Sequence, residues 1–222
     1  MLEQRPGKVV GVGLNYRDHA AELGIEVPES PLLFMKPSSS IVGDGDAIVV
    51  DPAVTSFPDW EVELAVVIGA RLHGASPEEA RAGIAGYTVA NDVSARDIQE
   101  REGQWFRAKS LHTFCPLGPR VAPAKEIADP QALTLRAWLN GELVQDSSTS
   151  EMAVGVFELV AFCSHSFALE PGDVVLTGTP PGVGMAQDPP RALRHGDVIE
   201  VEIPPIGRLR NPVVERSAHA AA

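Results

Sequence analysis

Residues 60–68 read WEVELAVVI, an apolar stretch rich in Val that is typical of a buried β-strand. Because successive side chains of a strand point to opposite faces, the even-numbered residues of this stretch share one face, and Glu61 and Glu63 lie on the other, roughly 7 Å apart. Two carboxylates beside small apolar residues repel each other when both ionise away from water, so a proton or a cation must neutralise the pair. An edge strand with a solvated acidic face is the alternative that this pattern leaves open.

Further strand-like segments lie on both sides of this stretch, at 8–14, 47–50, 86–92, 173–177 and 197–203. Alternating residues around Asn140-Gly141 predict a hairpin over 133–145.

Three helices are expected between these strands. The first follows a cap at Asn15 and closes at Gly24, the second starts at a capping box formed by Ser76 and Glu79, and the third lies within 151–166. Many strands, few helices and no βαβα alternation predict an α+β, mostly β fold, a mixed β-sandwich or roll. We expect a single domain over residues 1–222, with a frayed tail from about residue 212.

The composition excludes several classes of protein. Of 222 residues, 44% are hydrophobic and 22% charged, which indicates a globular chain, and 18 basic against 30 acidic residues give a net charge of −12. Such a surface repels phosphate backbones and anionic lipids, so we expect neither nucleic-acid nor membrane binding. The longest apolar run, Leu64–Ala70, is far shorter than the roughly 18 residues of a membrane span. The N-terminus lacks the pattern of a signal peptide, which leaves the cytoplasm as the expected location.

A third acid strengthens the case for a cation at Glu61 and Glu63. Asp92 stands where the expected strand over 86–92 ends, and polar residues follow it. Three carboxylate ligands suit a hard octahedral ion such as Mg²⁺ or Mn²⁺, whereas zinc would be expected to recruit histidine or cysteine.

The chain resembles the fumarylacetoacetate hydrolase family over roughly residues 8–204. The resemblance rests on seven segments in the family's order, which are VGLNYRDHAAE, LFMKPSSS, DWEVELAVVIG, GYTVANDVSARDIQ, FRAKSLHTFCPLGP, NGELVQ and LEPGDVVLTGTPPGVG. In length the chain is similar to the short acylpyruvase and oxaloacetate decarboxylase members. The resemblance implies the C-terminal-domain fold of that family, a homodimer, and Mg²⁺ or Mn²⁺ held by Glu61, Glu63 and Asp92.

His19 and Glu22 stand three apart on the expected first helix, so their side chains share a face. A carboxylate beside an imidazole fixes the tautomer and raises the basicity of the ring, although such a pair is also common as a surface contact. The resemblance implies a catalytic dyad on a lid segment, because short hydrolytic relatives carry the same pair.

The resemblance also implies roles for five polar residues. Lys109 matches a lysine that reaches into the site, where an ammonium stabilises an oxyanion. Arg96 and Gln99 match positions that bind carboxylate and carbonyl oxygens, although Arg96 could merely pair with a neighbouring acid. Thr179 matches a substrate-contacting threonine, and Lys36 is expected to approach the site from its loop.

These assignments favour hydrolysis of a C–C bond in an acylpyruvate-type 2-oxo (di)carboxylic acid, with water activated by His19 and Glu22 and a pyruvate enolate as leaving group. The same metal ligands would serve an isomerase of a 2-hydroxy-diene-dioate, as in homoprotocatechuate-type catabolism of aromatic compounds, or a decarboxylase of oxaloacetate. A non-catalytic, metal-dependent dicarboxylate-binding protein is a further alternative.

Overall fold

The computed structural model describes residues 5–216, and its largest element is a seven-stranded sheet. In spatial order the strands are β2 (Leu32–Lys36), β1 (Val9–Gly13), β12 (Val174–Leu176), β6 (Val62–Ile68), β7 (Ile84–Asn91), β9 (Cys115–Pro123) and β3 (Ile41–Val42). Strand β6 lies in the middle and is antiparallel to both of its neighbours. The alternative of a solvated edge strand is therefore wrong.

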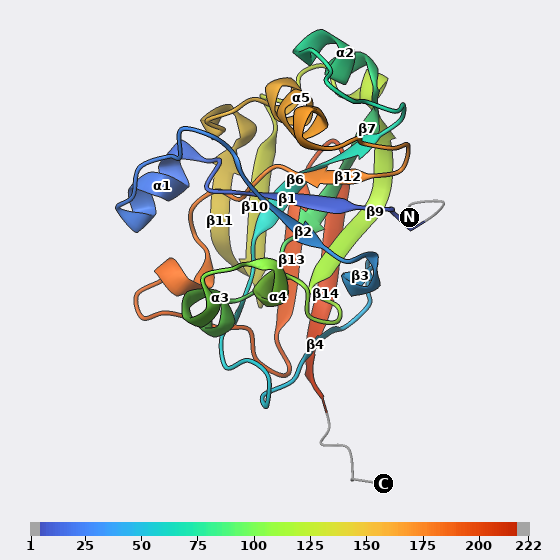
Figure 1. Cartoon of the computed structure of the whole chain (residues 1–222). Helices are drawn as coiled ribbons and strands as arrows, with labels where there is room; N and C mark the ends of the chain where they lie inside the picture. The colour runs from blue at the N-terminus through green and yellow to red at the C-terminus, as the bar shows by residue number, and fades with distance from the viewer. Residues whose placement is uncertain (1–4, 217–222) are drawn as a thin grey trace, which may run out of the picture.

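A second sheet has five strands and lies behind β1 and β2 in the view of Figure 1. In spatial order its strands are β11 (Glu142–Ser148), β10 (Thr134–Leu139), β13 (Val198–Ile203), β14 (Gly207–Glu215) and β4 (Ile48–Val50). Short strands β5 (Pro58–Asp59) and β8 (Ser94–Ala95) pair separately. The main hydrophobic core draws on both large sheets, with Leu64 from one and Leu135 and Val201 from the other. The predicted α+β, mostly β sandwich is confirmed.

The two faces of β6 differ as the sequence alternation predicts. Val62, Leu64 and Val66 belong to the main core, whereas Ala65 and Val67 pack in a smaller cluster on the opposite face of the sheet. All seven residues of β6 are buried, so the strand has no solvent-facing side.

Short helices surround the sheets. They are α1 (Arg17–Leu23), α2 (Pro77–Ala82), α3 (Arg96–Glu102), α4 (Phe106–Lys109) and α5 (Val156–Ser166), with 3-10 turns η1 (Ser38–Ser40), η2 (Ala124–Glu126), η3 (Thr149–Glu151) and η4 (Gly184–Ala186). Helices α2 and α5 lie together at the top of Figure 1, whereas α1 lies at its left edge. The capping box of α2 is confirmed, because the Ser76 hydroxyl accepts a hydrogen bond from the Glu79 amide and the Glu79 carboxylate accepts one from Ser76.

Helix α1 begins at Arg17, one residue later than a cap at Asn15 predicts, and Asn15 does not cap it. The Asn15 amide instead donates to the carbonyl oxygens of Val154 and Thr177, and its side-chain oxygen accepts from the Val154 amide. The Asn15 side chain therefore forms tertiary hydrogen bonds in place of the helix cap that the local sequence predicts. Gly24 ends the helix in the left-handed region, as predicted.

Six strands lie outside the predicted segments, namely β2, β3, β5, β8, β9 and β14. Strand β2 lies between Pro31 and Pro37, which flank it without interrupting it. Strand β14 runs to Glu215 and pairs with β13 and β4, so fraying from residue 212 is wrong for 212–215. Residues 217–222 lie outside the described part.

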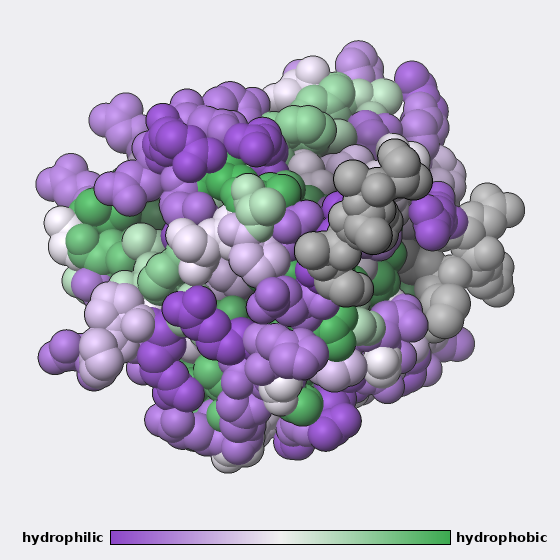
Figure 2. Space-filling view, turned by 90° about the horizontal axis from the view of Figure 1, so that it is seen from below, coloured by the Kyte–Doolittle hydropathy of each residue, from purple (hydrophilic) through white to green (hydrophobic). Residues whose placement is uncertain are grey.

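The surface shown in Figure 2 is largely hydrophilic, with apolar residues in small separate groups. Among the helices of residues 5–216, none has the length and apolar character needed to cross a membrane.

Candidate active site

Three buried carboxylates meet at one end of the β6–β7 pair. Glu61 directly precedes β6 and Asp92 directly follows β7, and the antiparallel register joins these ends through a 2.9 Å hydrogen bond from the Asp92 amide to the Glu61 carbonyl oxygen. One ligand atom from each of Glu61, Glu63 and Asp92 lies within 4.8 Å of the others, and the residues are 5%, 1% and 0% exposed. The structure thus brings the predicted metal trio together.

Two buried lysines contact these carboxylates. The Lys109 Nζ lies 2.7 Å from Oε2 of Glu61 and 2.7 Å from Oδ2 of Asp92. The Lys36 Nζ lies 2.5 Å from Oδ1 of Asp92 on the other side. Both oxygens of Asp92 therefore face a lysine ammonium, which fixes the orientation of its carboxylate.

Arg96, at the start of α3, connects the trio to a fourth buried acid. Its Nη2 lies 2.6 Å from Oε1 of Glu61, and its Nε donates to Oδ2 of Asp59 at 2.8 Å. Its Nη1 donates to Oε1 of Gln99 at 3.0 Å, so these two predicted substrate-binding residues contact each other. Asp59 also accepts a hydrogen bond from the Gly184 amide at 2.6 Å, which ties the cluster to η4. Sequence reasoning missed Asp59, although it opens the matching segment DWEVELAVVIG.

The charges around Glu61 and Glu63 differ. Burial by itself would raise the pKa of Glu61, but the Lys109 and Arg96 cations outweigh it and hold the pKa well below its usual value. Burial, together with the charges of Asp92 and Glu61, raises the pKa of Glu63 well above its usual value. Within residues 5–216, Glu63 has no cation in salt-bridge contact; the Gly178 amide donates to its Oε2 at 2.8 Å.

This arrangement fits a divalent cation. A buried carboxylate without a cation is costly, and Glu63 is such a group beside two others. The donor set consists of carboxylate oxygens alone, which are the ligands that Mg²⁺ and Mn²⁺ prefer.

His19 and Glu22 form the predicted pair on α1. The His19 Nδ1 lies 2.9 Å from Oε2 of Glu22, and Oε1 of Glu22 accepts from the Gly182 amide at 2.8 Å. His19 is 6% exposed, so its ring is held in place rather than free in solvent. With Nδ1 bonded to Glu22, Nε2 is the nitrogen left for proton transfer.

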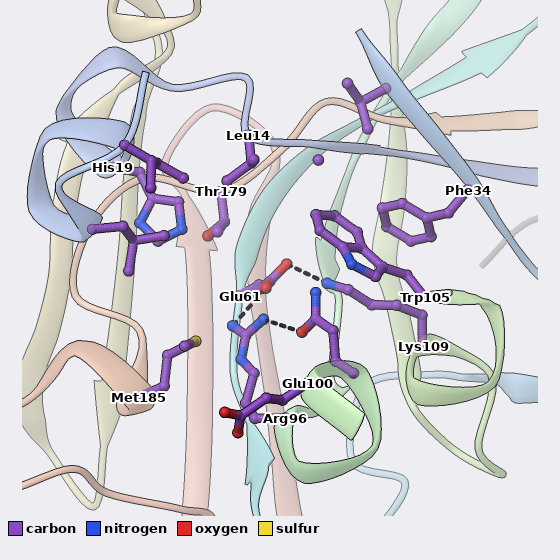
Figure 3. A pocket seen from close by; sticks show the side chains of 15 residues that line it. Leu14, His19, Phe34, Glu61, Arg96, Glu100, Trp105, Lys109, Thr179 and Met185 are labelled. Carbon is purple, nitrogen blue, oxygen red and sulfur yellow. Dashed lines mark hydrogen bonds and ion pairs between the residues drawn. The ribbon is translucent and has the colours of Figure 1, made fainter. Parts of the chain in front are cut away.

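A cavity of about 460 Å³ joins the His19 side of the site to the acidic cluster (Figure 3). Six of the predicted site residues line it, namely His19, Glu61, Arg96, Gln99, Lys109 and Thr179. Thr179 is anchored there because its hydroxyl donates to the Val62 carbonyl oxygen at 2.9 Å and accepts from Gln145 at 3.0 Å. Lys36 does not line the cavity and contacts Asp92 instead.

The cavity wall also contains residues that the sequence reasoning did not identify. Leu14, Phe34, Trp105 and Met185 form apolar parts of the wall, and Glu100 lies there as well. Phe34 and Trp105 pack with ring centroids 5.8 Å apart, and the Lys109 ammonium lies 5.1 Å from the centre of the Phe34 ring. Leu14 and Phe34 stand within two of the matching segments, but their place on the wall, like that of Glu100, Trp105 and Met185, depends on how separate elements pack together.

Comparison with known proteins gives consistent matches over nearly the whole chain. The mitochondrial oxaloacetate tautomerase of Rattus norvegicus is 48% identical over 211 residues, which are 95% of this chain and 67% of that protein. Among solved structures, the 5-carboxymethyl-2-hydroxymuconate delta-isomerase of Mycobacterium smegmatis has a TM-score of 0.86 at 41% identity, covering 96% of this chain and 81% of that one. A fumarylacetoacetate hydrolase from Exiguobacterium antarcticum has a TM-score of 0.89 at 42% identity, with 96% and 76% covered.

The sequence profile of the fumarylacetoacetate hydrolase C-terminal domain matches residues 8–214. The resemblance inferred from the seven motif segments is confirmed, and the chain belongs to the fumarylacetoacetate hydrolase family.

Proposed function

We propose that this protein is a divalent-metal-dependent isomerase that moves a proton between C3 and the keto oxygen of a small 2-oxo acid. Oxaloacetate is the first substrate to test. The rat relative is named a tautomerase and the mycobacterial structure an isomerase, and these names favour isomerisation. The sequence motifs alone favoured hydrolysis.

The observation that carries the proposal is the position of His19 relative to the cationic groups of the cavity. His19 lies on one side of the cavity, and Lys109 and Arg96 lie across it around Glu61 (Figure 3). A proton transfer next to a carbonyl needs a base near C3 and positive charge near the oxygen, and the cavity holds both kinds of group.

In the keto-to-enol direction, Nε2 of His19 takes the proton from C3 while Glu22 stabilises the imidazolium. The enolate oxygen then takes a proton from solvent water, and the imidazolium returns its proton to solvent, which gives the enol and regenerates His19. The negative charge that grows on the keto oxygen is stabilised by the Lys109 ammonium and the Arg96 guanidinium, which are already held in place by buried acids. Glu61, Glu63 and Asp92 would hold the ion, which supplies Lewis acidity beside the substrate oxygens.

Hydrolysis of an acylpyruvate is the second candidate. The 2.9 Å contact between His19 and Glu22 favours it, because a histidine with a carboxylate partner is also a suitable base for activating water. Apolar residues of the cavity wall, such as Leu14 and Leu23, favour proton transfer, because they leave few polar groups to hold an attacking water.

The test uses Mn²⁺-loaded protein and the enol form of oxaloacetate, with loss of the enol absorbance as the readout. We expect rapid conversion to the keto form, loss of activity with EDTA, and a decrease of about 10² to 10⁴-fold in His19→Gln. His73→Gln, which changes an exposed histidine, is the matched control and should retain activity.

Acetylpyruvate cleaved to pyruvate faster than the enol is converted would instead favour hydrolysis, and tight oxalate binding without turnover of any 2-oxo acid would favour a binding protein. Light scattering tests the homodimer that we also propose.

A further inference from the structure

Asp59 is a buried acid to which the proposed reaction gives no task. It is 0% exposed, it does not belong to the acidic trio, and it does not line the cavity. A buried carboxylate is costly unless neighbouring donors satisfy it. The role of Asp59 therefore lies in the groups that its two oxygens hold.

Four donors converge on the Asp59 carboxylate. Its Oδ1 accepts from the backbone amides of Trp60 at 2.8 Å and Gly184 at 2.6 Å. Its Oδ2 accepts from the Met185 amide at 3.1 Å and from Nε of Arg96 at 2.8 Å. Three of these donors are backbone groups, whose directions are set by the fold. The carboxylate is therefore fixed independently of the arginine that it holds.

The fold brings three segments together around Asp59. Strands β5 and β8 pair so that Asp59 stands opposite Ser94, two residues before Arg96, and the Arg96 amide donates to the Phe57 carbonyl oxygen at 2.9 Å. On the other side, η4 approaches so closely that a Cβ on Gly184 would lie 2.7 Å from Oδ1 of Asp59. Asp59 thus lies between the start of α3 and η4.

Arg96, unlike Asp59, lines the cavity, and a second acid competes for it. Its Nη2 lies 2.6 Å from Oε1 of Glu61, a contact that Figure 3 shows as a dashed line. Guanidinium and carboxylate groups commonly pair through two parallel hydrogen bonds. An Arg96 side chain without the bond from Nε to Asp59 could turn onto Glu61 and form such a pair, which would move it from its place on the wall.

We propose that Asp59 is a positioning residue, which holds the Arg96 guanidinium beside the keto oxygen of the substrate and prevents it from turning onto Glu61. This inference rests on the proposed proton transfer, in which Arg96 stabilises the charge on that oxygen. It assigns a part in that reaction to a residue that the substrate does not contact.

Asp59→Asn tests the inference with little change of shape. The amide oxygen can still accept from Trp60 and Gly184, but the amide NH₂ would face the two donors on the other side and cannot accept from Arg96. With Mn²⁺ at saturation, we expect kcat/KM for enol-oxaloacetate to fall by about 10- to 100-fold. Asp59→Glu keeps the negative charge but displaces the carboxylate, and it should act in the same direction if the first variant folds poorly.

Asp173→Asn is the matched control. Asp173 is 1% exposed, accepts from the amides of Lys8 and Glu170 at 2.8 and 2.7 Å, and lies 2.5 Å from the Lys8 ammonium. It is a buried acid with backbone and cationic partners, but it lies outside the cavity, where its carbonyl oxygen accepts from Ile68 at the far end of β6. Its substitution should lower stability and leave kcat/KM of the folded protein unchanged within about twofold.

A double-mutant cycle shows whether Asp59 acts through Arg96. Arg96→Lys should itself lower kcat/KM by about 10²-fold, because it removes the guanidinium. In that background Asp59→Asn should cost less than about a further threefold, since no guanidinium remains to be positioned. The same loss in both backgrounds would mean that Asp59 acts independently of Arg96, and the inference would be overturned.

Two further measurements need no reaction. Oxalate presents two adjacent anionic oxygens to the Mn²⁺-loaded protein, and its calorimetric Kd should rise by about tenfold in Asp59→Asn and stay the same in Asp173→Asn. A crystal structure of Asp59→Asn should show the Arg96 guanidinium paired with Glu61 through two hydrogen bonds. A guanidinium that has not moved would overturn the inference.

The outcomes separate this inference from the proposed function. If the wild-type protein converts enol-oxaloacetate and Asp59→Asn converts it equally well, the inference is overturned and the proton-transfer function stands. If the wild-type protein converts no enol, the proposed function fails. The place of Arg96 in the crystal structure and the oxalate Kd values then decide whether Asp59 positions this side chain.

Discussion

The Lys36 ammonium lies 2.5 Å from Oδ1 of Asp92, and neither side chain is exposed to solvent. Removing one partner of a buried ion pair leaves an uncompensated charge, which commonly costs several kcal/mol. We expect Lys36→Met to lower the free energy of unfolding by about 3 kcal/mol, as measured by urea denaturation.

The control for this substitution is Arg71→Met. Arg71 pairs with Glu170 on the surface, where the side chains are 65% and 48% exposed, so its loss should cost less than about 1 kcal/mol. Equal costs for the two variants would show that burial of the Lys36–Asp92 pair does not matter for stability.

Glu63 provides the sharpest test of the metal site, because it is the carboxylate of the trio without a lysine or arginine contact in the described chain. We expect Mn²⁺ to bind the dialysed protein and to raise its Tm, since a ligand that binds only the folded state stabilises it. Glu63→Gln should weaken Mn²⁺ binding by at least about tenfold, measured by calorimetry. An unchanged Kd would place the ion elsewhere.

The capping box of α2 can be tested without touching the site. Ser76→Ala removes the hydroxyl that accepts from the Glu79 amide, and the expected cost is about 1 kcal/mol in urea denaturation. Ser39→Ala, at an exposed serine of η1, should change stability by less than about 0.5 kcal/mol. If Ser76→Ala leaves the free energy of unfolding unchanged, solvent must satisfy the backbone N–H groups at the start of α2.

Both cysteines are buried, and burial raises the pKa of Cys115 to about 12 and that of Cys163 to about 12. At pH 8, four units lower, roughly one thiol in 10⁴ is ionised, and the thiolate is the reactive form. We expect no reaction of the folded protein with a disulfide reagent such as DTNB at pH 8, and two reactive thiols per chain after denaturation. Rapid reaction of the native protein would contradict the burial of these thiols.

Local patterns predicted those features that depend on residues close in sequence. The alternation of β6, the Asn140-Gly141 hairpin and the Ser76 capping box are all confirmed, because period, turn chemistry and capping act within a few residues. The role of Asn15 could not be predicted from such local patterns, since its hydrogen bonds join it to residues more than 130 positions away.

The site shows the same limit. Charge repulsion between Glu61 and Glu63 is enough to indicate a cation from the sequence alone, and Asp92 follows from its place at a strand end. The contact between Lys36 and Asp92 could not be predicted in this way. The alternation of side chains along β2 does not indicate whether Lys36 points toward Asp92 or into the cavity. The apolar cavity wall could likewise not be predicted from the sequence, because its residues come from five separate segments of the chain.

Helix α1 has only seven residues, too few to persist in water unless it is docked. Hydrogen bonds dock the helix: Arg17 donates to the Met152 carbonyl oxygen, Ser147 donates to the Asp18 carboxylate, and the Gly182 amide donates to Glu22. The acidic trio belongs instead to the central sheet. The proposed base, His19, and the carboxylates that would hold the ion thus belong to separately anchored modules. Evolution or protein engineering could exchange the outer module, and with it the chemistry performed, without rebuilding the inner one.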